Sequence, residues 1–378
     1  MGKIELDHTG AGSGVTLSSD GTDLLLNGTA IGGGGAALEL YAENPSSPTA
    51  PSATGANAVA IGSESVSSGL DSFAIGRNTN AGNTRAIVLG GYSQAYGISS
   101  VSIGFSSTVN SNSTESSAIG SRAQIGSNAV GAAAINKSYA SGADSFAAAI
   151  ANNTSSYGAT GANSVAMGDR AKASGDRAFS LGRFGQATNV RSINIGDSAI
   201  CSGDSALAIG YTAVASQSFS TALGYRSSSD IVGKYAYAGG VFAATGDSQT
   251  GTFVLRSDTT DATPEALTTN NTAAGTDDQI ILPNNSAYAF HGTIVARQQA
   301  SAGTACAAWK IEGLIRREGS AGTTVLVNSA TTVLDNTPGW GMALSADTTN
   351  GGLKIEVTGA AATNIRWVAT VHTSEVTY

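Results

Sequence analysis

The chain has 378 residues, of which 49 are glycine and only 12% are charged. Its 19 basic and 27 acidic residues give a net charge of −8, and the basic residues are scattered singly, which argues against nucleic-acid binding. Two cysteines far apart in the sequence make no disulfide framework, and no apolar run approaches the roughly 18 residues of a membrane-spanning helix.

Residues 1–35 predict a small N-terminal β module. Val15-Thr16-Leu17 and Asp23-Leu24-Leu25-Leu26 read as two short strands, and the Asp20-Gly21 pair between them favours a tight turn. No basic stretch leads into an apolar run, so the sequence predicts no signal peptide and no membrane insertion.

Residues 36–52 are rich in Pro, Ser and Ala and predict a linker. Three of the six prolines in the chain, Pro45, Pro48 and Pro51, lie in one seven-residue span of this linker. This cluster marks the boundary of the next region.

A short phrase recurs through residues 53–245: a small residue, then Ile, Leu or Met, then usually Gly. A short fixed period predicts a solenoid, in which each copy is one coil that buries its apolar face against its neighbours. Most copies follow one another after 14 residues. The bulky residues are Ile61, Ile75, Leu89, Ile103, Ile119, Ile135, Ile150, Met167, Leu181, Ile195, Ile209 and Leu223.

A second large residue commonly lies two positions before the bulky one, as in Val59-Ala60-Ile61. Alternation with period two indicates a strand, so both large side chains share one face. We expect the large residues to fill the coil and the small ones between them to face outward, at Ala60, Ala74, Ser102, Ala166, Ser180 and Ala208. Such a thin coil cannot enclose a self-sufficient core, so we expect several chains, namely three, to associate.

The phrases Ala56-Asn57-Ala58-Val59-Ala60-Ile61-Gly62 and Ala162-Asn163-Ser164-Val165-Ala166-Met167-Gly168 resemble the head repeat of YadA-type trimeric autotransporter adhesins. The resemblance covers about half the chain and implies a homotrimeric, left-handed parallel β-roll used in surface adhesion. The export signal, heptad stalk and membrane anchor of that family are not visible in the sequence. Instead, the segments 6–31 and 246–264 resemble the terminal modules of tailed-phage fibre proteins.

Residues 246–378 lack the period and predict longer strands in a C-terminal antiparallel β-sandwich or jelly-roll-like domain. Trp309-Lys310-Ile311-Glu312 and Leu353-Lys354-Ile355-Glu356-Val357 alternate between apolar and polar residues, as half-buried strands do. The predicted strands are 252–256, 279–282, 287–297, 307–317, 323–327, 342–345, 353–358 and 364–371.

The residue types that carry chemistry form no convincing catalytic or metal-binding pattern. His8, His291 and His372 lie far apart in sequence. Cys201 and Cys306 are expected to be small buried side chains.

Asp176, Asp197 and Asp204 recur at coil turns, where they either cap the turn or line up as a cation ladder. The alternative to a non-catalytic protein is an enzyme that cleaves glycans, with its paired carboxylates drawn from Asp258, Asp261 and Glu265. The sequence favours a protein that is not an enzyme and needs no cofactor or metal.

Three aromatic residues are candidates for receptor contact. Trp340 lies in the loop sequence Asn336-Thr337-Pro338-Gly339-Trp340-Gly341, where an exposed indole could stack on a sugar. The alternative is that Trp340 folds back to close the sandwich. Tyr211 and Tyr225 each follow a repeat glycine at a coil corner.

These features predict a structural fibre of a tailed-phage virion, namely a tail fibre, that attaches the particle to the host cell. The N-terminal module would bind other virion proteins, and the C-terminal domain would bind a host surface glycan or protein. Two alternatives stay open: a bacterial trimeric surface adhesin, and an architectural head fibre or decoration protein.

Overall fold

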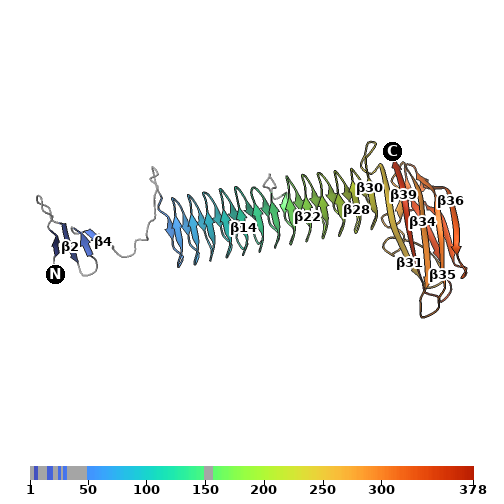
Figure 1. Ribbon diagram of the computed structural model, residues 1–378, viewed down its shortest axis with the longest axis horizontal. Helices are drawn as coiled ribbons and strands as arrows, with labels where there is room; N and C mark the ends of the chain where they lie inside the picture. The colour runs from blue at the N-terminus through green and yellow to red at the C-terminus, as the bar shows by residue number, and fades with distance from the viewer. Residues whose placement is uncertain (1–3, 7–14, 20–23, 27–28, 32–48, 149–155) are drawn as a thin grey trace.

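The computed structural model describes residues 49–148 and 156–378, together with the backbone of residues 4–6, 15–19, 24–26 and 29–31. In these ranges the chain is built of β-strands, with a single 3₁₀ turn, η1 (Ala321–Thr323). A solenoid of short strands leads into two antiparallel sheets near the C-terminus (Figure 1). Among the described residues no helix is long and apolar enough to cross a membrane.

The N-terminal residues form a four-stranded antiparallel sheet in the order β1-β2-β3-β4. Its strands are β1 (Ile4–Leu6), β2 (Val15–Ser19), β3 (Leu24–Leu26) and β4 (Thr29–Ile31). The two predicted runs are therefore confirmed as paired strands, with Leu17 opposite Leu26. The expected Asp-Gly turn and most of the proline linker lie outside the described residues.

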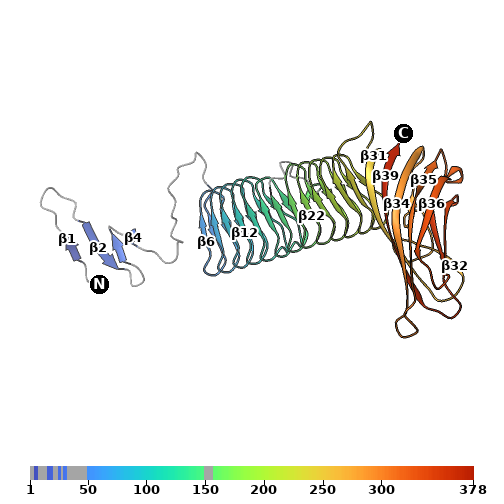
Figure 2. The same ribbon diagram turned by 45° about the vertical axis from the view of Figure 1, so that its right-hand side comes forward.

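The solenoid consists of two parallel sheets, to which each coil contributes one strand (Figure 2). The first sheet contains β6 (Val59–Ile61), β8 (Phe73–Ile75), β10 (Ile87–Leu89), β12 (Val101–Ile103), β14 (Ser117–Ile119), β16 (Ala133–Ile135), β18 (Phe146–Ala148), β20 (Val165–Met167), β22 (Phe179–Leu181), β24 (Ile193–Ile195), β26 (Leu207–Ile209), β28 (Thr221–Gly224) and β30 (Tyr235–Ala238).

The second sheet has 13 strands of two residues each. They are β5 (Ser52–Ala53), β7 (Val66–Ser67), β9 (Asn80–Ala81), β11 (Gln94–Ala95), β13 (Thr108–Val109), β15 (Gln124–Ile125), β17 (Tyr139–Ala140), β19 (Gly158–Ala159), β21 (Lys172–Ala173), β23 (Gln186–Ala187), β25 (Ile200–Cys201), β27 (Val214–Ala215) and β29 (Ser228–Ser229).

The register of the first sheet corrects the repeat in two places. Ala148 pairs with Ile135 on one side and with Met167 on the other, so Ala148, not Ile150, holds the ladder position of that coil. Ile150 itself lies outside the described residues. Tyr237 pairs with Leu223, which adds one coil beyond the last predicted copy.

The direction of the repeat side chains is opposite to the expectation. The small residues between the large ones face the coil interior: Ala74, Ala166 and Ala208 are each 0% exposed. The flanking large residues face outward, with Phe73 43% and Ile75 37% exposed. Because a 14-residue coil brings its two sheets close together, its interior is filled mainly by Ala and Ser, and most bulky side chains stay outside.

The corners of the coils take part in the hydrogen-bond ladder. The N–H of Asp71, which has a φ of 54°, donates to the carbonyl of Ala56 at 2.9 Å in the preceding coil. Tyr92, with a φ of 60°, donates to Arg77 in the same way at 2.8 Å. Left-handed residues recur at equivalent corners, so hydrogen bonds join the coils around their turns as well as along their strands.

The repeat glycines are required by the stacking of the coils. Gly90 has a φ of 112°, and a Cβ atom there would collide with the carbonyl oxygen of Gly104 in the next coil. L-residues rarely adopt this backbone conformation, and the short distance between coils leaves no space for a side chain.

The C-terminal region is a sandwich of two antiparallel sheets. The larger sheet runs in the order β31 (Ser248–Thr259), β39 (Ile365–Thr377), β34 (Ser286–Gln298), β35 (Cys306–Arg317) and β36 (Val325–Asp335). In the smaller sheet β38 (Gly352–Thr358) pairs with β37 (Gly341–Asp347) along one edge and with β32 (Pro264–Ala266) and β33 (Ile280–Ile281) along the other. Both sheets contribute to one buried apolar core.

A buried ion pair joins the solenoid to the sandwich. Lys234, at the last corner, is 1% exposed, and its Nζ atom donates to Glu375 of β39 at 2.8 Å. Gln249 Nε2 donates to the same carboxylate oxygen at 2.8 Å. The ammonium also lies over the rings of Phe253 and Tyr288. Strand β30 pairs directly with β31, so the solenoid sheet continues into the larger sheet of the sandwich (Figure 2).

Replacement of a repeat glycine should destabilise the solenoid. We expect Gly90→Ala to lower the free energy of unfolding by about 3 kcal/mol, because the methyl group meets backbone atoms and the φ is unfavourable. Gly91→Ala is the matched control: its Cβ would have no neighbour closer than 3.8 Å. Urea unfolding followed by circular dichroism measures both. Equal midpoints for the two variants would contradict the requirement for glycine.

Candidate functional site

The first candidate surface is the outward face of the first solenoid sheet. We call the first and third residues of the first-sheet strands, the even-numbered strands from β6 to β30, the apolar wall. The wall contains no charged side chain. Its most exposed members are Phe73, Ile75, Ile87, Ile119, Ile135, Met167, Leu181, Ile193, Tyr235 and Tyr237, each between 36% and 51% exposed.

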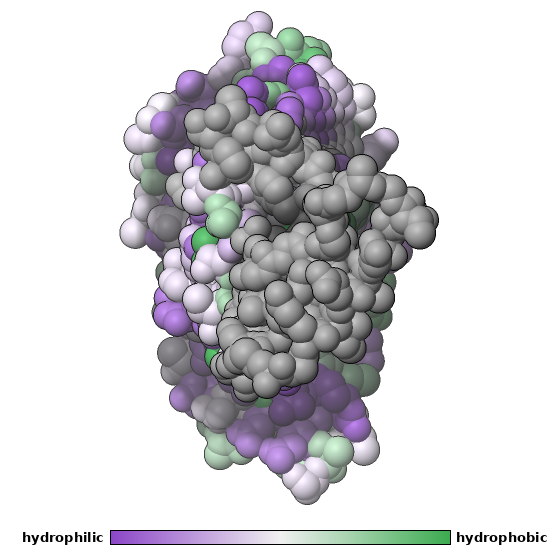
Figure 3. All heavy atoms as spheres, turned by 90° about the vertical axis from the view of Figure 1, so that its left-hand side faces the viewer, coloured by the Kyte–Doolittle hydropathy of each residue, from purple (hydrophilic) through white to green (hydrophobic). Residues whose placement is uncertain are grey.

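Contiguous exposed apolar patches are rare on soluble monomers and mark interaction surfaces. The absence of charge from the wall is typical of the core of a protein interface. Figure 3, in which the left-hand side of Figure 1 faces the viewer, shows hydrophobic residues scattered among hydrophilic ones at this end of the molecule. The wall is therefore a surface suited to contact with another protein chain.

The wall continues onto the sandwich. Tyr237 of β30 is opposite Thr250 of β31, and the same outward row passes through Ser374, Ala289 and Leu314 on the next strands. Leu314 is 40% exposed, and a shallow depression of about 600 Å³ lies along this row.

Tyr211 and Tyr225 form the second candidate surface, at a corner of neighbouring coils. Their rings stack with centroids 5.2 Å apart and an interplanar angle of 13°. They are 49% and 45% exposed, so the pair offers one aromatic face to the solvent. The sequence predicted their position at coil corners, whereas a receptor role for them stays a prediction.

Trp340 does not provide the exposed indole that the loop sequence suggested. It is 6% exposed and its ring lies 5.7 Å from that of Trp367 within the sandwich core. Asn336 holds the loop in place: its Oδ1 accepts from Trp340 N at 2.9 Å and its Nδ2 donates to Trp340 O at 2.7 Å. Trp340 is instead folded back into the sandwich, as the alternative expectation had it.

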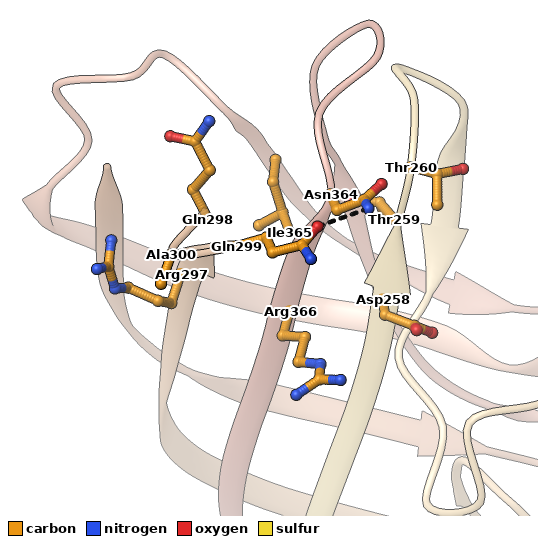
Figure 4. A pocket seen from close by; sticks show the side chains of 10 residues that line it. All are labelled: Asp258, Thr259, Thr260, Arg297, Gln298, Gln299, Ala300, Asn364, Ile365 and Arg366. Carbon is orange, nitrogen blue, oxygen red and sulfur yellow. Dashed lines mark hydrogen bonds between the residues drawn. The ribbon is translucent and has the colours of Figure 1, made fainter. Parts of the chain in front are cut away.

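A pocket of about 440 Å³ lies at the end of the larger sheet (Figure 4). Asp258, Arg366 and Arg297 occupy one cross-strand row, on β31, β39 and β34. In Figure 4 the two guanidinium groups point away from each other, and Asn364 Nδ2 donates to Gln299 Oε1 at 2.8 Å. Exposed arginine and amide side chains of this kind can hydrogen-bond the carboxylate and hydroxyl groups of an acidic glycan.

The carboxylates considered for glycan cleavage each have a local partner. Asp258 Oδ1 accepts from Asn271 at 3.0 Å, and Glu265 Oε2 accepts from Ser257 at 2.6 Å; both acids line one pocket of about 380 Å³. The hydrogen bond from the Thr263 N–H lowers the pKa of Asp261, which is opposite to what a general acid needs.

The turn aspartates pair with arginines. Arg183 Nε lies 3.2 Å from Asp197 Oδ2 in the next coil, and Arg191 Nη2 lies 3.4 Å from Asp204 Oδ2. Asp176 lies 3.5 Å from the guanidinium of Arg177. Each of the three turn carboxylates thus lies beside a guanidinium group. Among the described residues no group of three or more His, Cys, Asp or Glu side chains is arranged to hold a metal ion.

The two cysteines differ. Cys201 is buried at an interior position of the solenoid, as expected, and burial raises the pKa of its thiol to about 11. Cys306 begins β35 and is exposed, so the expectation that it is buried is wrong.

His8 lies outside the described residues, whereas His291 and His372 are brought together on neighbouring strands. Sequence reasoning missed this pair because the register of distant strands cannot be read from a single sequence.

The fold defines the class of this protein: a repeat protein whose short coils stack into a parallel β-solenoid. The repeat itself is of the YadA head type. The family model of the YadA head domain repeat (2 copies) matches residues 53–79, 81–107, 159–184 and 202–227. The chain thus carries YadA-like head repeats, as the resemblance implied.

One solved structure with similarity is a tailspike protein gp49 from Acinetobacter baumannii bacteriophage Fri1, a capsular polysaccharide depolymerase. The sequence identity is 11% and the TM-score is 0.24, over 84% of this chain and 54% of that one. The chain thus spans about half the length of the tailspike. No curated protein matches the sequence.

Substitutions within one strand should reveal which side chains face inward. We expect Ala166→Leu to lower the free energy of unfolding by about 3 kcal/mol, because the added atoms enter an interior lined by alanines. Met167→Ser, at the neighbouring outward position, should keep the strand-type circular dichroism spectrum. A folded Ala166→Leu variant beside an unfolded Met167→Ser variant would contradict the assigned orientation.

Proposed function

We propose that this protein is a non-catalytic attachment fibre, namely a tail fibre, of a tailed-phage virion. The observation that carries the proposal is the uncharged apolar wall on a repeat solenoid that ends in a sandwich. A solenoid supplies length and stiffness, and an apolar wall supplies a surface for assembly. The resemblance of residues 6–31 and 246–264 to the terminal modules of tailed-phage fibre proteins adds to this support, since it favours a particle over a cell envelope.

We infer a homotrimer in which three walls meet along the solenoid. Burial of the remaining exposed area would contribute about 1 kcal/mol for each half-exposed Ile, Leu or Phe, repeated along the rod. The YadA-like repeats add to this inference. Three copies of a weak terminal site on one rigid fibre would bind a surface with high avidity.

We assign the host contact to the C-terminal sandwich and the particle contact to the N-terminal module. The pocket with Arg297 and Arg366 supports a glycan as the host ligand. The rival adhesin function would use the solenoid itself, with the stacked Tyr211 and Tyr225 as its contact. An architectural role as a head fibre or decoration protein would need neither surface.

Binding of the labelled full-length chain to bacterial strains of defined capsule type separates these functions. We expect Arg297→Ala/Arg366→Ala to weaken binding at least about tenfold, because each arginine can form charge-assisted hydrogen bonds. Arg177→Ala, which removes an exposed arginine on the solenoid, is the matched control and should bind normally.

Loss of binding in Tyr211→Ala/Tyr225→Ala, with normal binding in the arginine variant, would instead support the adhesin. The same incubation tests catalysis: release of new reducing ends from the capsular polysaccharide would contradict the non-catalytic assignment. If the unmodified chain binds none of the strains to which its particle adsorbs, the architectural role is favoured.

A further inference from the structure

Two of the three histidines of the chain meet on the outward face of the sandwich. His291 of β34 is directly opposite His372 of β39, and their ring centroids are 5.3 Å apart with an interplanar angle of 33°. Both side chains are exposed. Directly opposite residues of antiparallel strands have Cβ atoms about 5 Å apart, so the two imidazoles share one place on the sheet.

A hydrogen bond orients one of the rings. His372 Nδ1 lies 3.1 Å from Thr252 Oγ1 of β31. We assign the proton to Nδ1, which donates to the hydroxyl and leaves Nε2 as a free lone pair. Metal-binding histidines commonly have one ring nitrogen fixed in this way while the other faces the ion.

The surroundings of the pair are polar and open to water. Glu312 of β35 is directly opposite His291, so a carboxylate continues the row Thr252, His372, His291. Lys310 is the next outward residue of β35. Together with the two histidines and Glu312 it lines a second pocket of about 440 Å³, separate from the pocket with Arg297 and Arg366. One acidic and one basic side chain therefore flank the imidazoles, and water has access to complete a coordination shell.

We propose that His291 and His372 bind a divalent transition-metal ion that prefers imidazole nitrogen, such as Zn²⁺ or Ni²⁺. Ring nitrogens bind Zn²⁺ at about 2.0 to 2.1 Å, which requires the two nitrogens to lie roughly 3.4 Å apart. The ring centroids lie 5.3 Å apart, so rotation about the side-chain bonds can bring one nitrogen of each ring toward that separation. Two imidazoles are the protein ligands and water completes the shell. Ca²⁺ and Mg²⁺ are poor occupants because they prefer oxygen ligands.

The competing interpretation is a cross-strand ring contact with no ligand. Titration of the full-length, tag-free chain with ZnCl₂, followed by calorimetry, separates the two. We expect about one ion per chain, with affinity that falls on acidification because protons compete for the imidazole nitrogens. His291→Gln and His372→Gln should each weaken binding at least about tenfold, since each removes one of two ligands.

His8→Gln is the matched control, because His8 is the remaining histidine of the chain and lies far from the pair in sequence. It should bind Zn²⁺ like the unmodified protein. Both sandwich positions are exposed, so the variants should fold, and circular dichroism verifies this. Unchanged affinity in the two sandwich variants, or an equal loss in His8→Gln, would overturn the proposal.

Thr252 is a positioning residue, and its role has a separate readout. Thr252→Val keeps the size of the side chain but removes the hydroxyl, and should weaken Zn²⁺ binding by about tenfold. Thr252→Ser keeps the hydroxyl and should restore the affinity. If Thr252→Val binds Zn²⁺ as tightly as the unmodified chain, the hydroxyl does not orient His372.

Discussion

The small interior of a 14-residue coil is the constraint on which the architecture depends. The two solenoid sheets lie so close that Ala and Ser fill most of the space between them, and the stacked glycines leave no space for a side chain. Large apolar residues must then stay on the outside of the first sheet. The same constraint that makes each coil regular therefore produces an exposed apolar wall along the solenoid.

The sandwich closes the C-terminal end of this solenoid. Terminal coils of repeat proteins need a cap, because their last strands would otherwise expose unpaired backbone groups. Here β30 pairs with β31, and Ile231 of the last corner belongs to the sandwich core. The buried pair of Lys234 and Glu375 lies at the same junction, where removal of one partner would leave an unpaired buried charge. Repeat and sandwich are thus joined by backbone, apolar and ionic contacts.

Much of the fold could be predicted from the sequence, because the period and the alternation of residues such as Val59-Ala60-Ile61 locate the strands. Alternation does not say which face is inside, and the usual preference for burying large residues gave the wrong answer. Strand β36 was predicted only in part. Almost all of its side chains are exposed, and the residues from Asn328 to Thr332 show no alternation of apolar and polar types. Trp340 and the pair of His291 and His372 depend on contacts between distant segments, which no local pattern contains.

The mass of the full-length chain in solution tests the central claim, that the apolar wall is covered by other copies of the chain. Light scattering coupled to size exclusion measures it without reference to molecular shape. The account predicts about 112 kDa, three times the 37.4 kDa of one chain. A stable species of 37.4 kDa would mean that the wall is open to solvent, and would contradict the assembly on which the proposed fibre depends.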